Sequence, residues 1–144
     1  MTNDKDIEAP LKTTAPKMKI LNQFIKDLSF ENIAAQNGIS DQNVKPDIKV
    51  SIGLEGKKRP VEDQYDLIIK VSITSKTGGS GEVIFLLELE YGGIFEITNI
   101  DSEQLQPYLL VECPRIMFPY LRRIISDVTS DGGYPPLNLE QIDF

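Results

Sequence analysis

Apolar and polar residues alternate strictly along two stretches in the middle of the chain. In residues 47–55 every second side chain is aliphatic, and in residues 65–73 one complete face is aromatic or aliphatic. The apolar positions are Ile48, Val50, Ile52 and Leu54, then Tyr65, Leu67, Ile69, Val71 and Ile73. A period of two is typical of a strand in a sheet with one solvated face. The polar residues between the two stretches suit a hairpin loop.

Two further strands are expected after a glycine-rich turn at residues 77–81. The segment 82–90 (EVIFLLELE) is apolar on both faces until Glu88. A strand of this kind is covered on both sides, or it exposes an apolar patch that binds a partner. Residues 91–93 (YGG) then lead into a fourth strand at 93–100, and such short connections favour antiparallel neighbours.

The C-terminal third predicts two helices. The first, at 101–112, is short or kinked because Pro107 interrupts it. The second begins at Pro114, since proline is favoured at a first helical position, and stops at the Gly132-Gly133 pair. Its apolar stripe comprises Met117, Phe118, Leu121, Ile124, Ile125 and Val128. A helix with this stripe packs against a sheet or a second subunit.

The N-terminal part carries weaker signals. Residues 1–19 are polar and hold two prolines, so we expect a disordered tail followed by one domain at 20–144. Residues 20–31 fit either a short edge strand or a turn of helix, and the pattern does not decide between them. Residues 32–46 are rich in Asn, Gly and Asp and predict a loop.

Charge and composition narrow the class of protein. The chain of 144 residues has 15 basic and 22 acidic residues, a net charge of −7. This balance argues against nucleic acid as a partner and is compatible with a basic protein partner. The first residues contain no apolar signal segment, and the apolar runs are too short to insert into a membrane. A cytoplasmic, soluble domain is expected.

Reactive side chains are scarce. The sequence has no histidine and one cysteine, which excludes Ser-His and Cys-His catalysis and a zinc cluster. A carboxylate pair at Glu88 and Glu90 remains as a hydrolase alternative to a solvated acidic face. Cys113, next to Pro114, is either a thiol with a lowered pKa at a helix start or, as we favour, a structural thiol. We expect no enzyme, no catalytic or metal-binding residue and no cofactor.

Three segments resemble the SecB family of bacterial protein-export chaperones. They are KDLSFE at 26–31, ELEYGGIFEI at 88–97, and CPRIMFPYLRRIISDVTSDGGYPPLNLEQIDF at 113–144. The resemblance implies an α+β subunit, with a four-stranded antiparallel sheet and helices packed on one side. It also implies a homotetramer, a dimer of dimers, that binds unfolded precursor proteins without ATP and delivers them to the motor SecA. Tetramerisation also fits Ile84, Leu86 and the wide helical stripe, which exceed what one small sheet covers.

The resemblance carries site residues over by position. A SecA-binding surface matches Asp27, Glu31, Leu86 and Glu88. For the client-binding groove that the resemblance implies, we nominate Val50, Ile52, Phe85, Tyr120 and Tyr134, each of which is otherwise a plain core residue. The alternative within the family is a SecB-like chaperone dedicated to a single partner, such as an antitoxin. SecB sequences usually continue past Asp143-Phe144 into another helix and an acidic tail, so either this branch or this chain is shortened.

Overall fold

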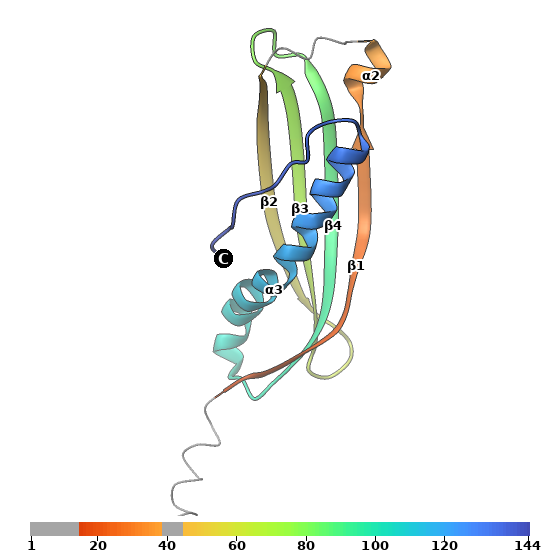
Figure 1. Cartoon of the computed structure of the whole chain (residues 1–144). Coiled ribbons are helices and arrows are strands. Elements are labelled where there is room, and N and C mark those ends of the chain that lie inside the picture. Colours follow the sequence, from red (N-terminus) through yellow and green to blue (C-terminus); the bar gives the residue numbers. More distant parts are fainter. Residues whose placement is uncertain (1–14, 39–44) are drawn as a thin grey trace, which may run out of the picture.

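The computed structural model describes residues 15–38 and 45–144. They form, in order, β1 (Lys17–Glu31), α2 (Ile33–Asn37), β2 (Pro46–Lys58), β3 (Gln64–Thr77), β4 (Val83–Thr98) and α3 (Ser102–Asp131). The strands make one antiparallel sheet in the order β1-β4-β3-β2, and α3 crosses one of its faces (Figure 1). The expected α+β architecture, a four-stranded antiparallel sheet with its long helix on one side, is confirmed for this subunit.

Side-chain alternation divides the sheet into two faces. The core face carries the odd-numbered residues of β3 and β4 and the even-numbered residues of β2, and α3 packs on it. Its central side chains are almost fully buried: Leu67, Ile69, Ile73, Leu87, Leu89, Phe95 and Ile97. The opposite face, called the open face, exposes polar side chains such as Lys70, Ser72 and Glu88. The strands predicted from period two are therefore confirmed in β2 and β3.

β4 is one strand of 16 residues, which corrects the prediction of two strands joined at residues 91–93. Gly92 and Gly93 lie inside the strand because neighbouring side chains pack directly against its backbone. A Cβ atom on Gly92 would lie 2.7 Å from Cζ of Phe24, closer than real Cβ atoms approach other atoms. These glycines create room for packing and do not form a turn.

The fourth strand of the sheet is β1, at the edge beside β4. It begins at Lys17, three residues before the boundary expected at Ile20. Of the tail predicted for residues 1–19, residues 1–14 lie outside the described residues. Its register with β4 shifts twice, between Ile20 and Asn22 and between Ile25 and Asp27. These bulges break the period of two, which is why the pattern did not distinguish a strand from a helix.

α3 is a single helix of 30 residues with Pro107, Pro114 and Pro119 inside it. The prediction of two helices, the second starting at Pro114, is therefore wrong. An interior proline costs about 3 kcal/mol because it removes a backbone hydrogen bond and crowds the preceding turn. The helix continues because one stripe stays buried against the sheet: Leu109, Cys113, Met117, Leu121, Ile124 and Ile125. Each large aliphatic side chain buried there contributes roughly 1.5–3 kcal/mol, which offsets the prolines.

The chain turns back after α3. The helix ends at Asp131, as the glycine pair predicts, and Gly133 has a left-handed φ of 93°. Residues 132–144, called the C-terminal segment, then cross the core face toward β2 (Figure 1). The Phe144 ring meets Phe118 edge-on, with 5.8 Å between ring centroids, and Leu139 is buried. The segment therefore covers a part of the core that α3 leaves open.

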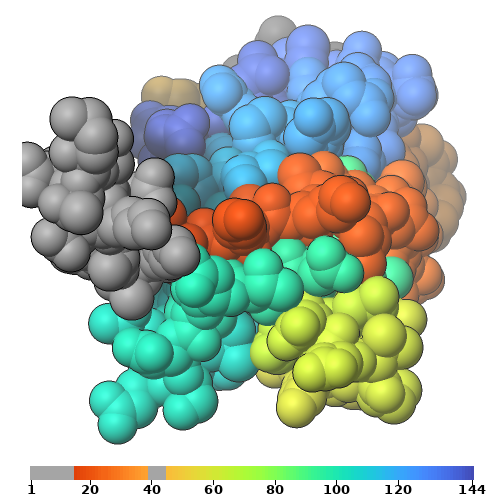
Figure 2. Space-filling view, turned by 90° about the horizontal axis from the view of Figure 1, so that it is seen from below, coloured from red at the N-terminus to blue at the C-terminus, as the bar shows by residue number. Residues whose placement is uncertain are grey.

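The connections close both ends of the sheet. At one end the glycine-rich turn at 77–81 joins β3 directly to β4, which confirms the predicted turn. At the other end the β2–β3 hairpin lies beside the β4–α3 connection and the start of β1 (Figure 2). Ile97 N donates to Asp63 O at 2.9 Å there, and Asn99 Nδ2 donates to Ala15 O at 2.7 Å. The loop predicted at 32–46 contains α2 and leads into β2, and residues 39–44 lie outside the described ranges.

Candidate functional site: an acidic sheet face and an apolar groove

The four residues expected at a SecA-binding surface lie together on the open face. Asp27 and Glu31 belong to β1, and Leu86 and Glu88 belong to β4. Glu31 stands directly opposite Leu86 in the β1–β4 ladder, and Glu88 stands opposite Ser29, between Asp27 and Glu31. Side chains two apart on a strand share a face, so the register brings all four to one surface.

Negative charge dominates this surface, which we call the acidic face. Its carboxylates are Asp27, Glu31, Glu88 and Glu90, and none of them takes part in the ion pairs formed among the described residues. Lys70, opposite Glu90, is bound to Glu55 at 3.1 Å. The hydrogen bond from Lys70, with its charge, lowers the pKa of Glu55. An open hollow of about 420 Å³ on this face is lined by the carboxylates of Asp27, Glu88 and Glu90 and by the single ammonium group of Lys70.

An apolar pocket of about 440 Å³ opens on the other side of the sheet. Phe85 of β4 and Tyr134 of the C-terminal segment line it, and both were expected in a client-binding groove. Their rings lie 5.0 Å apart between centroids, and Phe30 of β1 extends the stack at 5.3 Å from Phe85. Burial raises the pKa of the Tyr134 phenol, which stays neutral. The pocket therefore offers aromatic surface, with Asn32, Ser75 and Thr77 as polar residues in its lining.

The core-face side of β2 prolongs this pocket along an edge of the sheet. Ile48 lines the pocket, and Val50, Ile52 and Leu54 follow it on the same face. Val50 is 38% exposed and Leu54 is 36% exposed, because β2 is an edge strand of the sheet formed by the described residues and α3 does not cover it fully. Together, the pocket and this stripe form what we call the apolar groove. Val50 and Ile52, expected in a client groove, lie along it.

Tyr120 lies elsewhere. It is 50% exposed on α3. Burial, and to a smaller extent the nearby Tyr120, raise the pKa of Tyr91, which stands opposite Ile25 of β1. Tyr120 does not line the apolar pocket. It joins three exposed core-face residues of β1 in what we call the β1-side patch: Ile20, Ile25, Leu28 and Tyr120. The structure therefore separates Tyr120 from the other four residues expected in the groove.

Several residues of these surfaces were not predicted from the sequence. The pocket is also lined by Asn32 and by residues 135–137, which follow Tyr134. Asn32 had a readable signal, because Asn directly before a short helical segment is a favoured N-cap. The β1-side patch had no such sequence signal, since its members on β1 are spaced by five and three residues across the bulges. The pocket as a whole joins segments about 100 residues apart.

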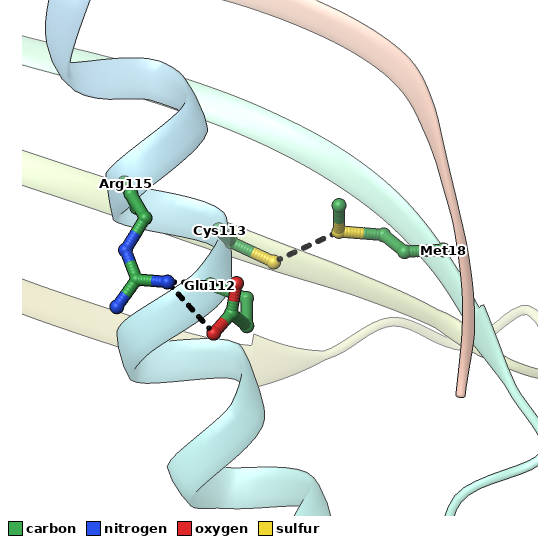
Figure 3. A network of polar contacts seen from close by, with 4 residues as sticks. All are labelled: Met18, Glu112, Cys113 and Arg115. Carbon is green, nitrogen blue, oxygen red and sulfur yellow. Dashed lines mark hydrogen bonds and ion pairs between the residues drawn. The ribbon is translucent and has the colours of Figure 1, made fainter. Parts of the chain in front are cut away.

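Cys113 is a structural thiol. It is fully buried, and Sγ donates to Sδ of Met18 at 3.6 Å (Figure 3). Burial and the neighbouring Glu112 carboxylate raise its pKa to about 12. The alternative of a lowered pKa at a helix start is wrong, because Cys113 lies in the middle of α3. Glu112 itself, with a side chain 39% exposed, binds Arg115 at 3.1 Å (Figure 3).

Within residues 15–38 and 45–144, no cluster of three or more acidic or cysteine side chains is placed to hold a metal ion. Over the same ranges, the helices are too short or too polar to span a bilayer. Glu88 and Glu90 share the open face of β4, as the hydrolase alternative required. Both line the open hollow of this face.

Comparison with known proteins decides among these interpretations. Residues 11–144 match the family described as preprotein translocase subunit SecB. The chain belongs to the SecB family. The protein-export protein SecB of Jannaschia sp. (strain CCS1) is 58% identical over 138 residues, covering 94% of this chain and 80% of its own. That of Dinoroseobacter shibae is 58% identical over 129 residues, covering 90% and 74%.

A solved structure shows the same fold. The SecB-like chaperone of Mycobacterium tuberculosis, bound to a peptide from an antitoxin, superposes with a TM-score of 0.72 over 97% of this chain and 99% of its own. The two sequences are 15% identical, so this likeness concerns the fold. As a SecB protein the chain is a chaperone of protein export and not an enzyme. The hydrolase alternative for Glu88 and Glu90 is thereby set aside.

Proposed function

We propose that this SecB chaperone binds unfolded precursor proteins in the cytoplasm, along the apolar groove, and holds them without ATP. The observation that carries the proposal is the partly exposed aliphatic stripe of β2 leading into the pocket at Phe85 and Tyr134. Unfolded chains present apolar side chains in no fixed order, so a long groove with a deep aromatic end suits them. The unpaired edge of β2 adds backbone groups that an extended client can use.

Delivery to SecA is assigned to the acidic face. On the open face, Leu86 is flanked by Glu31, opposite it in the ladder, and by Glu88, two residues along β4, while Asp27 stands further along β1, opposite Glu90. Opposite charge on a partner accelerates encounter and fixes its orientation, and an apolar residue among the charges adds contact area. The acidic face and the apolar groove lie on opposite faces of the sheet. An unfolded client and SecA therefore bind the chaperone at the same time.

Self-assembly is assigned to the β1-side patch, in a homotetramer built as a dimer of dimers. Ile25 is 47% exposed and Tyr120 is 50% exposed, beside a free edge of β1. Apolar side chains in such a patch are normally covered in soluble proteins. A symmetric contact between two copies buries the patch on both.

The single-partner alternative has less support. The relatives at 58% identity are named protein-export proteins, whereas the antitoxin-binding chaperone is 15% identical. Capture of many unrelated unfolded precursors by the wild-type protein would favour general export. Capture of one partner alone would favour the alternative.

A refolding assay tests client binding. A denatured precursor is diluted into buffer with and without the chaperone, and recovery of its folded state is followed. We expect the wild type to delay refolding, and Val50→Asp to shorten that delay because it places a charge in the groove. Ser51→Asp adds the same charge to the same strand on the open face and serves as the matched control. A wild type that causes no delay, or two variants with equal delays, contradicts the proposal.

A further inference from the structure

The Asn32 side chain, at the rim of the apolar pocket, makes three hydrogen bonds: one to α2 and two to the turn that follows α3. Asn32 Oδ1 accepts from Ala35 N at 3.1 Å, which caps α2, and from the Tyr134 hydroxyl at 2.5 Å. Asn32 Nδ2 donates to Gly132 O at 3.0 Å. The amide thus uses its acceptor and its donor at once, and an apolar side chain of similar size makes none of these bonds. Asn32 joins α2 to the end of α3 across 100 residues of sequence.

The pocket wall next to Asn32 is fixed at both backbone ends. Tyr134 N donates to Thr129 O at 3.1 Å, and Leu137 N donates to Thr129 Oγ1 at 2.9 Å. Between them stand Pro135 and Pro136, whose rings restrict the backbone. The wall backbone is therefore rigid, and the direction of the Tyr134 side chain is the part that remains adjustable.

The Tyr134 ring is held from two sides. Its face packs on Phe85 at 5.0 Å, and its hydroxyl is tied to Asn32. Phe30 also packs on Phe85, at 5.3 Å between ring centroids, and it lies so close to Gly132 that a Cβ atom there would overlap its ring. The aromatic residues at the floor of the pocket and the hydrogen bonds of Asn32 thus contact the same turn of the chain, at Gly132 and Tyr134.

We infer that Asn32 is a positioning residue of the apolar groove, which fixes the Tyr134 ring against Phe85 and so sets the width of the pocket. The inference rests on the proposed client-binding function and adds a selectivity to it. A pocket of fixed width with an aromatic floor selects bulky apolar side chains of an extended chain over small ones. When the hydroxyl loses its partner, the ring leaves Phe85, and the pocket no longer distinguishes the two classes.

The test uses two labelled extended peptides that differ at one central position, Phe or Ala, with binding measured by fluorescence anisotropy. We expect the wild type to prefer the Phe peptide. Asn32→Ala and Tyr134→Phe should each reduce this preference by about fivefold, the factor that one hydrogen bond of ordinary strength supports. Asn32→Asp keeps both acceptor contacts, to Ala35 and Tyr134, and loses only the donor bond to Gly132 O, so it should keep the preference if Asn32 acts through the Tyr134 hydroxyl. Asn22→Ala, an exposed amide on the open face of β1, is the control.

A double variant separates positioning from a general structural effect. If Asn32 acts through the Tyr134 hydroxyl, Asn32→Ala combined with Tyr134→Phe loses no more preference than either change alone. Additive losses, or an unchanged preference in Asn32→Ala, overturn the inference while client binding by the wild type still stands. A wild type that binds neither peptide overturns the proposed function itself. Should Asn32→Ala fail to fold, Tyr134→Phe and Asn32→Asp still decide the outcome, because the first must lose the preference and the second must keep it.

Discussion

Gly93 of β4 lies directly beneath Met117 of α3. A Cβ atom on Gly93 would stand 3.1 Å from Met117 Sδ and 2.7 Å from Cε1 of Phe95. On the open face, Phe24 and Ile68 pack equally closely against the backbone of its neighbour Gly92. The pair therefore lets side chains approach the middle of β4 from both sides, and α3 rests on the sheet at the centre of the core.

Gly93→Ala should destabilise the subunit. The added methyl group must displace Phe95 or Met117 from a filled core, and overpacking of this kind costs about 1–3 kcal/mol. Urea unfolding followed by circular dichroism measures the change in the free energy of unfolding. Gly53→Ala is the matched control, because nothing lies within 4 Å of a Cβ atom there. Equal unfolding midpoints for both variants would contradict the close contact between α3 and β4.

Removing charge from the acidic face should weaken SecA binding and spare client binding. Asp27→Ala combined with Glu88→Ala should lower the affinity about tenfold at low salt, or about 1.4 kcal/mol. The difference should shrink as salt screens exposed charges. Glu62→Ala with Glu140→Ala removes equal charge elsewhere and should leave the affinity unchanged. Loss of the refolding delay in the first double variant would instead place its residues in the client site or in the fold.

A charge in the β1-side patch should break the assembly. Ile25→Glu puts a carboxylate where the proposed contact between copies excludes water, and we expect a particle smaller than a tetramer by light scattering. Val61→Glu makes the same change at a residue of the β2–β3 loop with 48% exposure, close to the 47% of Ile25. It should leave the particle mass unchanged. The assignment of the patch fails if Ile25→Glu keeps the wild-type mass, or if the wild type is itself a monomer.

Stability should fall at alkaline pH through Cys113. The pKa of this thiol is raised in the folded state from 9.0 to about 12. The unfolded thiol therefore releases its proton first, so the stability present below the unfolded pKa is lost as pH rises between these values. The expected slope from this group is about 1.4 kcal/mol per pH unit.

Comparison with Cys113→Ala isolates that effect, because the tyrosines remain in both proteins. The variant should lose less stability between pH 9.0 and about 12 than the wild type does. At lower pH, the native thiol should react with a thiol reagent only as fast as the subunit opens. Rapid labelling of the folded protein, or equal alkaline slopes, would show that Cys113 is reached by solvent.

Elements governed by a simple period were predictable from the sequence. β2 and β3 have one solvated face each, so apolar and polar residues alternate along their sequences. The prediction divided β4 wrongly because glycine usually marks a turn. At Gly92 and Gly93, glycine instead makes room for Phe24 and Met117, which lie far away in the chain. α3 was divided wrongly because the local cost of a proline is visible in the sequence, and the burial that offsets it is not.

The candidate surfaces were predictable to different degrees. Asp27 and Glu31 could be grouped with Glu88 through the family motifs, and the β1–β4 register explains why they share a face. Phe85 and Tyr134 were named as groove residues, but the contact between their rings depends on the return of the chain after α3. The role inferred for Asn32 required a bond across 102 positions, which no local pattern contains.

Alternation along β4 has an evolutionary consequence. Phe85 and Leu87 belong to the core face, while Leu86 and Glu88 between them belong to the open face. Deleting or inserting one residue here would exchange the two sets along the rest of the strand. Alignments of this chaperone across lineages should therefore show no gaps in this strand, even where single residues are substituted.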